Sequence, residues 1–97
     1  MKNSAPTHLK GAARQMWTRL RADYQIDDSA GLALLQAACE SFARAAGARG
    51  LIGKDGPVLT DRFGQKKAHP ACAIERDARG QMIAALRALK LAPGDAP

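Results

Sequence analysis

The sequence predicts one mainly α-helical domain in which two helices are followed by a short β-hairpin or extended loop and then a C-terminal helix. Apolar residues recur at helical spacing in three segments. Aspartate, glycine and proline fall where such helices would begin or end. A chain of 97 residues leaves room for a single domain. We expect this domain over residues 9–93, with flexible tails at 1–8 and 94–97.

The first helix is predicted over residues 10–24. Its apolar face has the spacing i, i+3, i+4, i+7 and i+11, and consists of Ala13, Met16, Trp17, Leu20 and Tyr24. Lys10, Arg14 and Arg21 lie beside this face and project in one direction. A row of three cations suits successive phosphates of DNA, but a solvated face whose aliphatic stems cover the core has the same pattern.

The second helix is predicted over residues 29–48. Asp27 and Asp28 offer an N-cap, and Gly47 and Gly50 are expected to end the helix. One face carries most of the large apolar side chains, among them Leu32, Leu35, Cys39 and Phe42.

A second apolar stripe on the same helix lies off its main face and consists of Leu34, Ala37, Ala45 and Ala48. A helix that is apolar most of the way round is buried on more than one side. Aromatic residues make up only 4% of the chain, so one copy has little bulk for a core. We therefore expect this stripe, with Ile83 and Leu86 of the third helix, to contact a second copy.

The middle of the chain predicts a small hairpin and a basic loop. Leu51-Ile52 and Val58–Thr60 flank an Asp-Gly turn, with Pro57 favouring an edge position. Residues 61–68 follow as a loop that is expected to form a second DNA-binding patch, and its cations are Arg62, Lys66 and Lys67. Phe63 stands beside them. A role in solubility explains the same charges.

The third helix is predicted to begin at His69-Pro70, because proline is favoured in a first turn, and to continue until Pro93 and Gly94 end it. Its apolar face consists of Ala71, Ile74, Ala78, Met82, Ala85 and Leu89. Glu75 and Arg79 are spaced for an ion pair on the helix surface.

Charge and composition narrow the class of protein. The net charge is +6, with most of the excess in residues 1–26 and in the middle loop, which suits either a polyanionic partner or simple solubility. No apolar run reaches the ~18 residues of a transmembrane helix, and residues 1–6 have no apolar segment, so we expect no secretory signal. Two cysteines 33 positions apart make no disulfide framework. A cytoplasmic protein without a membrane partner is expected.

The sequence predicts neither an enzyme nor a cofactor. A phosphate-binding Gly-x-x-x-x-Gly-Lys-Ser/Thr loop is absent. His69 and Cys72 are the only locally spaced metal ligands, short of the four that a structural zinc site needs. The same two residues lack an evident acid to orient them for catalysis. We expect no catalytic residue and no metal site.

The chain resembles the small subunits of phage terminases. The resemblance is carried by the stretch from Asp61 to Arg79, with its His-Pro-Ala and Glu-Arg-Asp-Ala segments, and by the Leu-rich run from Leu86 to Pro93. Leu9, Ala13, Trp17, Leu35 and the Ala38-Cys39-Glu40 segment extend it over most of the chain. Lys10 stands where that family usually has a capping Ser or Thr.

The resemblance implies a function in viral genome packaging. Small subunits of this family bind double-stranded phage DNA, assemble as homo-oligomeric rings and pass the DNA to the large terminase subunit, which carries the ATPase and nuclease. Two other interpretations remain open. In one, the chain is an oligomeric scaffold or adaptor that does not touch DNA. In the other, it is a small helix-turn-helix regulator, although its alanine-rich second helix is poorly suited to contact bases in the major groove.

Overall fold

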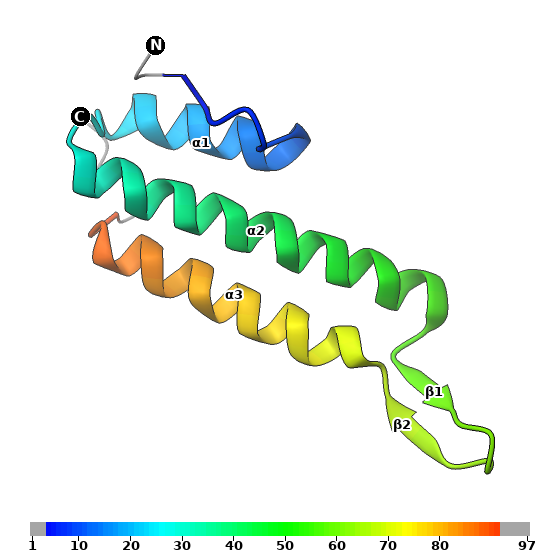
Figure 1. The fold of residues 1–97 in the computed structure, drawn as a ribbon. Coiled ribbons are helices and arrows are strands. Elements are labelled where there is room, and N and C mark those ends of the chain that lie inside the picture. Colours follow the sequence, from blue (N-terminus) through cyan, green and yellow to red (C-terminus); the bar gives the residue numbers. More distant parts are fainter. Residues whose placement is uncertain (1–3, 92–97) are drawn as a thin grey trace.

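The computed structural model describes residues 4–91. Its elements, in chain order, are α1 (Gly11–Asp23), α2 (Ser29–Asp55), β1 (Val58–Thr60), β2 (Lys66–Ala68) and α3 (Pro70–Ala88). The strands form an antiparallel hairpin between α2 and α3 (Figure 1). The mainly α-helical class and the predicted order of elements are confirmed. The expected tail at 94–97, and residues 1–3 of the other tail, lie outside the described residues.

Helix α2 is longer than predicted, and the hairpin has a different register. Gly47 and Gly50 lie inside α2, which continues to Asp55 because it packs against α3 along this length. Gly56, with φ of 83°, ends the helix rather than turning a hairpin. Strand β1 pairs with residues 66–68, so the predicted pairing of 51–52 with 58–60 is wrong, and the last three residues of the expected basic loop are strand.

The predicted helix starts are confirmed, whereas the end of α3 is not. The Asp28 side chain accepts a hydrogen bond from the Gly31 N–H at 2.8 Å and caps α2. Pro70 occupies the first turn of α3. This helix ends at Ala88, before the expected Pro93, because Lys90 adopts a left-handed conformation with φ of 59°.

Helices α2 and α3 pack antiparallel along a seam of small side chains (Figure 1). The seam positions repeat every three and four residues, as in a coiled coil. On α2 they are Ala38, Ser41, Ala45, Ala48 and Ile52, and on α3 they are Ala71, Glu75, Ala78, Met82 and Ala85. The register follows from three cross-helix contacts, Arg44–Gln81 at 3.3 Å, Arg49–Glu75 at 3.8 Å and Asp55–His69 at 3.0 Å.

Glu75 is a charged member of this seam, with 9% of its surface exposed. The Arg79 guanidinium donates to both of its carboxylate oxygens, and Arg49 approaches from α2. A buried carboxylate is tolerated when it is paired in this way. The predicted Glu75–Arg79 pair is therefore present, but the carboxylate faces the seam, while Ile74 of the expected apolar face is half exposed.

The main apolar core lies at one end of this helix pair, where α1 covers the first half of α2 (Figure 1). Its buried members are Ala5, Leu9, Ala13, Trp17, Ile26, Leu35 and Cys39. The other half of the pair extends from this core as an arm that ends in the hairpin. The described chain is accordingly elongated, at 55 × 24 × 21 Å with a radius of gyration of 16.4 Å, against about 12.5 Å for a compact domain of this length.

The glycines inside α2 provide a test of its helical length. A Cβ added at Gly50 meets nothing within 4 Å. We expect Gly50→Ala to raise the free energy of unfolding by about 0.5–1 kcal/mol, because alanine loses less backbone entropy in a helix. At Gly31 the added Cβ would lie 2.7 Å from Asp28 Oδ1 and 2.9 Å from Ile26 Cγ2, so Gly31→Ala is expected to destabilise. Urea unfolding of both variants checks this, and two changes of the same sign would contradict it.

Candidate nucleic-acid interface

The hairpin at the end of the arm has a turn built by Asp61. Its Oδ1 accepts hydrogen bonds from the backbone N–H groups of Phe63 and Gln65 at 2.8 and 2.9 Å. Its carbonyl oxygen accepts a hydrogen bond from the N–H of Gly64 at 3.0 Å. Gly64 has φ of 80°, a conformation that favours glycine. Because three hydrogen bonds converge on one residue, the backbone of the turn is fixed, and with it the points from which the exposed side chains leave the turn.

Two of the three predicted cations of this region lie on strand β2. Lys66 pairs in register with Thr60, and Lys67 with Leu59. Lys67 Nζ is also 3.5 Å from Asp61 Oδ2, although its side chain is 66% exposed. Arg62 lies in the turn itself. The structure therefore places Arg62, Lys66 and Lys67 on one hairpin, with the two lysines at consecutive strand positions and so on opposite faces of the ribbon. We call these three residues with Phe63 the hairpin tip.

Phe63 is exposed at 76% of its surface, the highest value among the large apolar residues that the structure describes. The Arg62 guanidinium lies over its ring, 4.9 Å from the centroid. Such a cation–π contact leaves the opposite face of the ring open to a planar partner. The aromatic ring and the cations thus form one surface.

His69 joins the hairpin to both helices. Its Nδ1 accepts a hydrogen bond from the N–H of Ala71 at 3.0 Å and so caps α3. Because Nδ1 is the acceptor, Nε2 is left to donate a hydrogen bond to Asp55 Oδ2 of α2 at 3.0 Å. The backbone N–H of His69 also donates to the Pro57 carbonyl at 2.8 Å. One side chain therefore ties the base of the hairpin to the helix on each side, and the hairpin tip is placed at a defined distance from the core.

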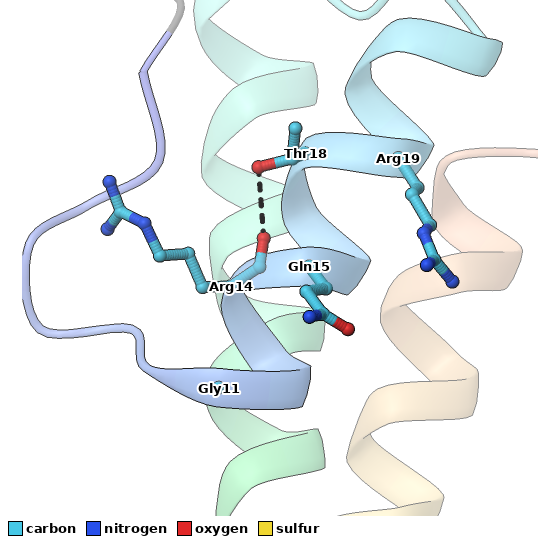
Figure 2. A pocket seen from close by; sticks show the side chains of 5 residues that line it. All are labelled: Gly11, Arg14, Gln15, Thr18 and Arg19. Atoms are coloured by element: carbon cyan, nitrogen blue, oxygen red, sulfur yellow. Dashed lines mark hydrogen bonds between the residues drawn. The ribbon is translucent and has the colours of Figure 1, made fainter.

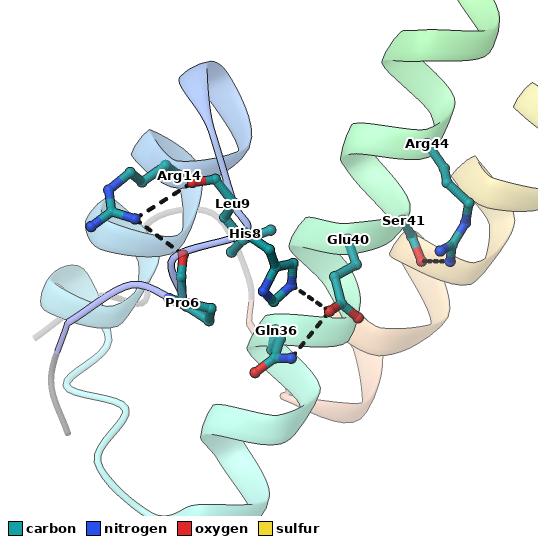
Figure 3. A network of polar contacts seen from close by, with 8 residues as sticks. All are labelled: Pro6, His8, Leu9, Arg14, Gln36, Glu40, Ser41 and Arg44. Carbon is teal, nitrogen blue, oxygen red and sulfur yellow. Dashed lines mark hydrogen bonds and ion pairs between the residues drawn. The ribbon is translucent and has the colours of Figure 1, made fainter.

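The predicted cations of the first helix are placed differently. Arg14 points back to the N-terminal segment, where it donates to the carbonyls of Pro6 and Leu9 (Figures 2 and 3). Arg21 is largely covered and pairs with Asp27 Oδ1 at 2.6 Å. Both side chains act within the fold. Lys10 is exposed at the N-cap of α1, and the side chain of Arg19, which the spacing argument missed, points away from Arg14 on the same helix (Figure 2).

A polar network holds the N-terminal segment against α2 (Figure 3). His8 Nε2 lies 2.7 Å from Glu40 Oε2, and the Gln36 amide donates to the same oxygen at 3.1 Å. The hydrogen bonds from Gln36 and His8 lower the pKa of the Glu40 carboxyl. Burial raises the pKa of the neighbouring Cys39 thiol to about 11, so this cysteine stays protonated at neutral pH.

The six residues expected at a subunit interface fall into two groups. Ala45 and Ala48 are buried against α3 of the same chain. Leu34 is half-buried and continues the seam line of α2 one turn before Ala38. Ala37 on α2 and Ile83 on α3 are exposed, and Leu86 on α3 is half-buried. Leu86 borders an open groove between α1 and α3, together with Met16, Leu20, Phe42 and Met82.

Among residues 4–91, no cluster of three or more His, Cys, Asp or Glu side chains is arranged to hold a metal ion. Both nitrogens of the His69 imidazole are engaged in hydrogen bonds with Ala71 and Asp55. In the same part of the chain, no helix is long and apolar enough to span a membrane.

The fold and the site define a small helical protein that presents a cationic β-hairpin at the end of a two-helix arm. Residues 13–96 match the family model described as phage terminase, small subunit. Because this match extends over most of the sequence, the chain belongs to the phage terminase small-subunit family. Neither the curated proteins nor the solved structures include a match.

Proposed function

We propose that this chain binds double-stranded phage DNA as a homo-oligomer in the host cytoplasm, delivers the DNA to the large terminase subunit and has no catalytic activity of its own. The observation that carries the DNA-binding part is the hairpin tip, where Arg62, Lys66 and Lys67 lie on one exposed hairpin around a turn that Asp61 holds. Asp61 is the single acidic residue between Val58 and Ala68, and its carboxylate is occupied by two backbone N–H groups and Lys67. A net positive surface suits DNA phosphates.

The predicted DNA-binding residues do not contribute equally to this proposal. Lys10, Arg62 and Lys66 make no ion pair within residues 4–91, so they are available to phosphates. Arg14 and Arg21 would first have to leave their contacts in the fold. We assign the main phosphate contacts to Arg62 and Lys66, a further one to Lys67, whose largely exposed side chain has only to leave Asp61, and a secondary one to Lys10.

The exposed apolar surfaces support the homo-oligomer. Ala37 lies on the same edge of the α2–α3 pair as Arg44, whereas Leu86 lies on the opposite edge, beside Phe42. Two different surfaces on one chain suit a head-to-tail contact between copies, which closes into a ring when the rotation permits. Light scattering tests this, and a monomer at micromolar concentrations would contradict it.

The DNA-binding part predicts a strong dependence on salt and on the hairpin tip. The observed binding constant for a duplex should fall linearly with salt on a logarithmic scale. Exchange of Lys66 and Lys67 for glutamate should weaken binding at least about tenfold and reduce the salt slope by about 2. Fluorescence anisotropy with a labelled duplex, titrated at several KCl concentrations, measures both quantities.

Arg87→Glu provides the matched control, because it reverses an exposed charge at the opposite end of α3. This variant should bind DNA with nearly the wild-type salt slope. Absence of wild-type binding at low salt would overturn the DNA-binding part. If the wild type binds and the tip variant matches it, the phosphate contacts lie elsewhere. Retention of large-subunit binding without DNA binding would favour the scaffold interpretation.

A further inference from the structure

We propose that Phe63 is a wedge that inserts between adjacent base pairs when the hairpin tip enters the minor groove of duplex DNA, and that it kinks the duplex there. This inference rests on the proposed DNA-binding function and assigns its mode. Binding to DNA phosphates requires only the cations of the hairpin tip, so it does not account for Phe63. Proteins that bind the minor groove use apolar side chains in this way, together with flanking cations.

The exposure of Phe63 is not explained by the fold. The turn is held by Asp61 and Gly64 through backbone groups, so a polar residue at position 63 would satisfy the same hydrogen bonds. The ring contributes nothing to the core at the other end of the molecule. A large aromatic surface in water on a rigid turn is a favourable anchor for a partner, because little conformational freedom is lost when it binds.

The surroundings of the ring favour nucleic acid over a protein partner. Three cations lie within the hairpin, and the carboxylate of Asp61 is only 20% exposed and already paired. Arg62 covers one face of the ring and leaves the other for a base. Stacking on an aromatic ring accepts any base, so the contact needs no hydrogen-bond readout and suits a protein that selects DNA by deformability.

The shape of the arm fits this insertion. Strands of three residues form a narrow ribbon, and the hairpin stands at the end of the helix pair, away from α1 (Figure 1). Lys66 and Lys67 follow the turn on one strand, so they can reach phosphates along the groove while the ring reaches the base pairs. Pyrimidine–purine steps unstack most easily and are the expected point of insertion.

The experiment compares Phe63→Ala with Val58→Ala in the full chain. Val58 is a control on the same hairpin, because it is 54% exposed but lies at the base of the ribbon, paired with Ala68. The probe is a mixed-sequence duplex with TA steps, carrying 2-aminopurine beside one step and a donor–acceptor pair at its ends. Anisotropy measures affinity, 2-aminopurine fluorescence measures unstacking, and energy transfer measures bending.

We expect wild-type protein and Val58→Ala to raise 2-aminopurine fluorescence and shorten the end-to-end distance. Phe63→Ala should lose both signals and bind about tenfold more weakly, with an unchanged salt slope because the ring carries no charge. Phe63→Leu, which keeps an apolar wedge, should restore part of the bending.

Equal unstacking and bending by Phe63→Ala and wild type would overturn the wedge while leaving the DNA-binding function intact. Failure of the wild type to bind any duplex would instead overturn the proposed function on which the wedge rests. A third result, in which Phe63→Ala bends DNA normally but loses binding to the large subunit, would assign the hairpin tip to a protein partner and also overturn the wedge.

Discussion

Trp17→Ala is expected to lower the free energy of unfolding by about 3–5 kcal/mol. Trp17 is 3% exposed and belongs to the buried cluster that joins the N-terminal segment, α1 and the first half of α2. Its removal leaves a large cavity in a core that holds few other bulky side chains. Since domains of this size are stable by roughly 5–15 kcal/mol, this loss removes a large share of the total stability.

Urea unfolding followed by circular dichroism measures this effect. Phe63→Ala is the matched control, because it also removes an aromatic ring but from a position that is 76% exposed. We expect this control to change the free energy of unfolding by less than about 1 kcal/mol. Similar losses for the two variants would contradict the described core.

Ala45→Leu is expected to produce a smaller but still substantial loss of stability, about 1–3 kcal/mol. Ala45 lies in the seam between α2 and α3 and is 3% exposed. A leucine there has no space unless the helices move apart, and displacement along the seam would also disturb the nearby contact between Arg44 and Gln81. Thermal unfolding of the variant at several protein concentrations measures the effect.

The neighbouring Ala46 provides the control, because it has the same side chain but faces away from α3 and is exposed. Ala46→Leu should change stability by about 0.5 kcal/mol or less. The concentration series separates the seam from a subunit contact. If Ala45→Leu changed only the association between copies and left the stability of a single copy unchanged, Ala45 would be part of the subunit interface that the apolar stripe predicts.

The sequence predicts the elements whose signals are local. Asp28 caps α2 through the nearby Gly31 N–H, and Pro70 begins α3 because its missing donor is not needed in a first turn. The place of Trp17 on an amphipathic face indicates a core residue, and the side chain is buried. Each of these depends on residues within one or two helical turns, so the spacing alone is sufficient.

The candidate site is predictable only in part. The grouping of Arg62, Lys66 and Lys67 follows from their closeness in sequence, and the hairpin keeps them together. Arg14 and Arg21 have the helical spacing that a row of phosphate-binding cations needs. This spacing carries no information about the Pro6 carbonyl and the Asp27 carboxylate that the tertiary structure places beside them. The role proposed for Phe63 requires the turn, since a ring beside cations in a flexible loop would not be held for insertion.

By itself, the sequence determined that the chain is basic and mainly helical and where its helices begin, because these properties depend on composition and on contacts between near neighbours. Its resemblance to one family was also visible in the order and spacing of its motifs. Only the tertiary structure decided that α2 passes through Gly47 and Gly50, since packing on α3 outweighs their helix-breaking tendency. It also decided that Glu75 rather than Ile74 faces the seam, because the packing of α3 on α2 follows the line Ala71, Glu75 and Ala78, and Arg49 and Arg79 compensate the carboxylate there. These outcomes arise between residues far apart in the chain, where spacing carries no signal.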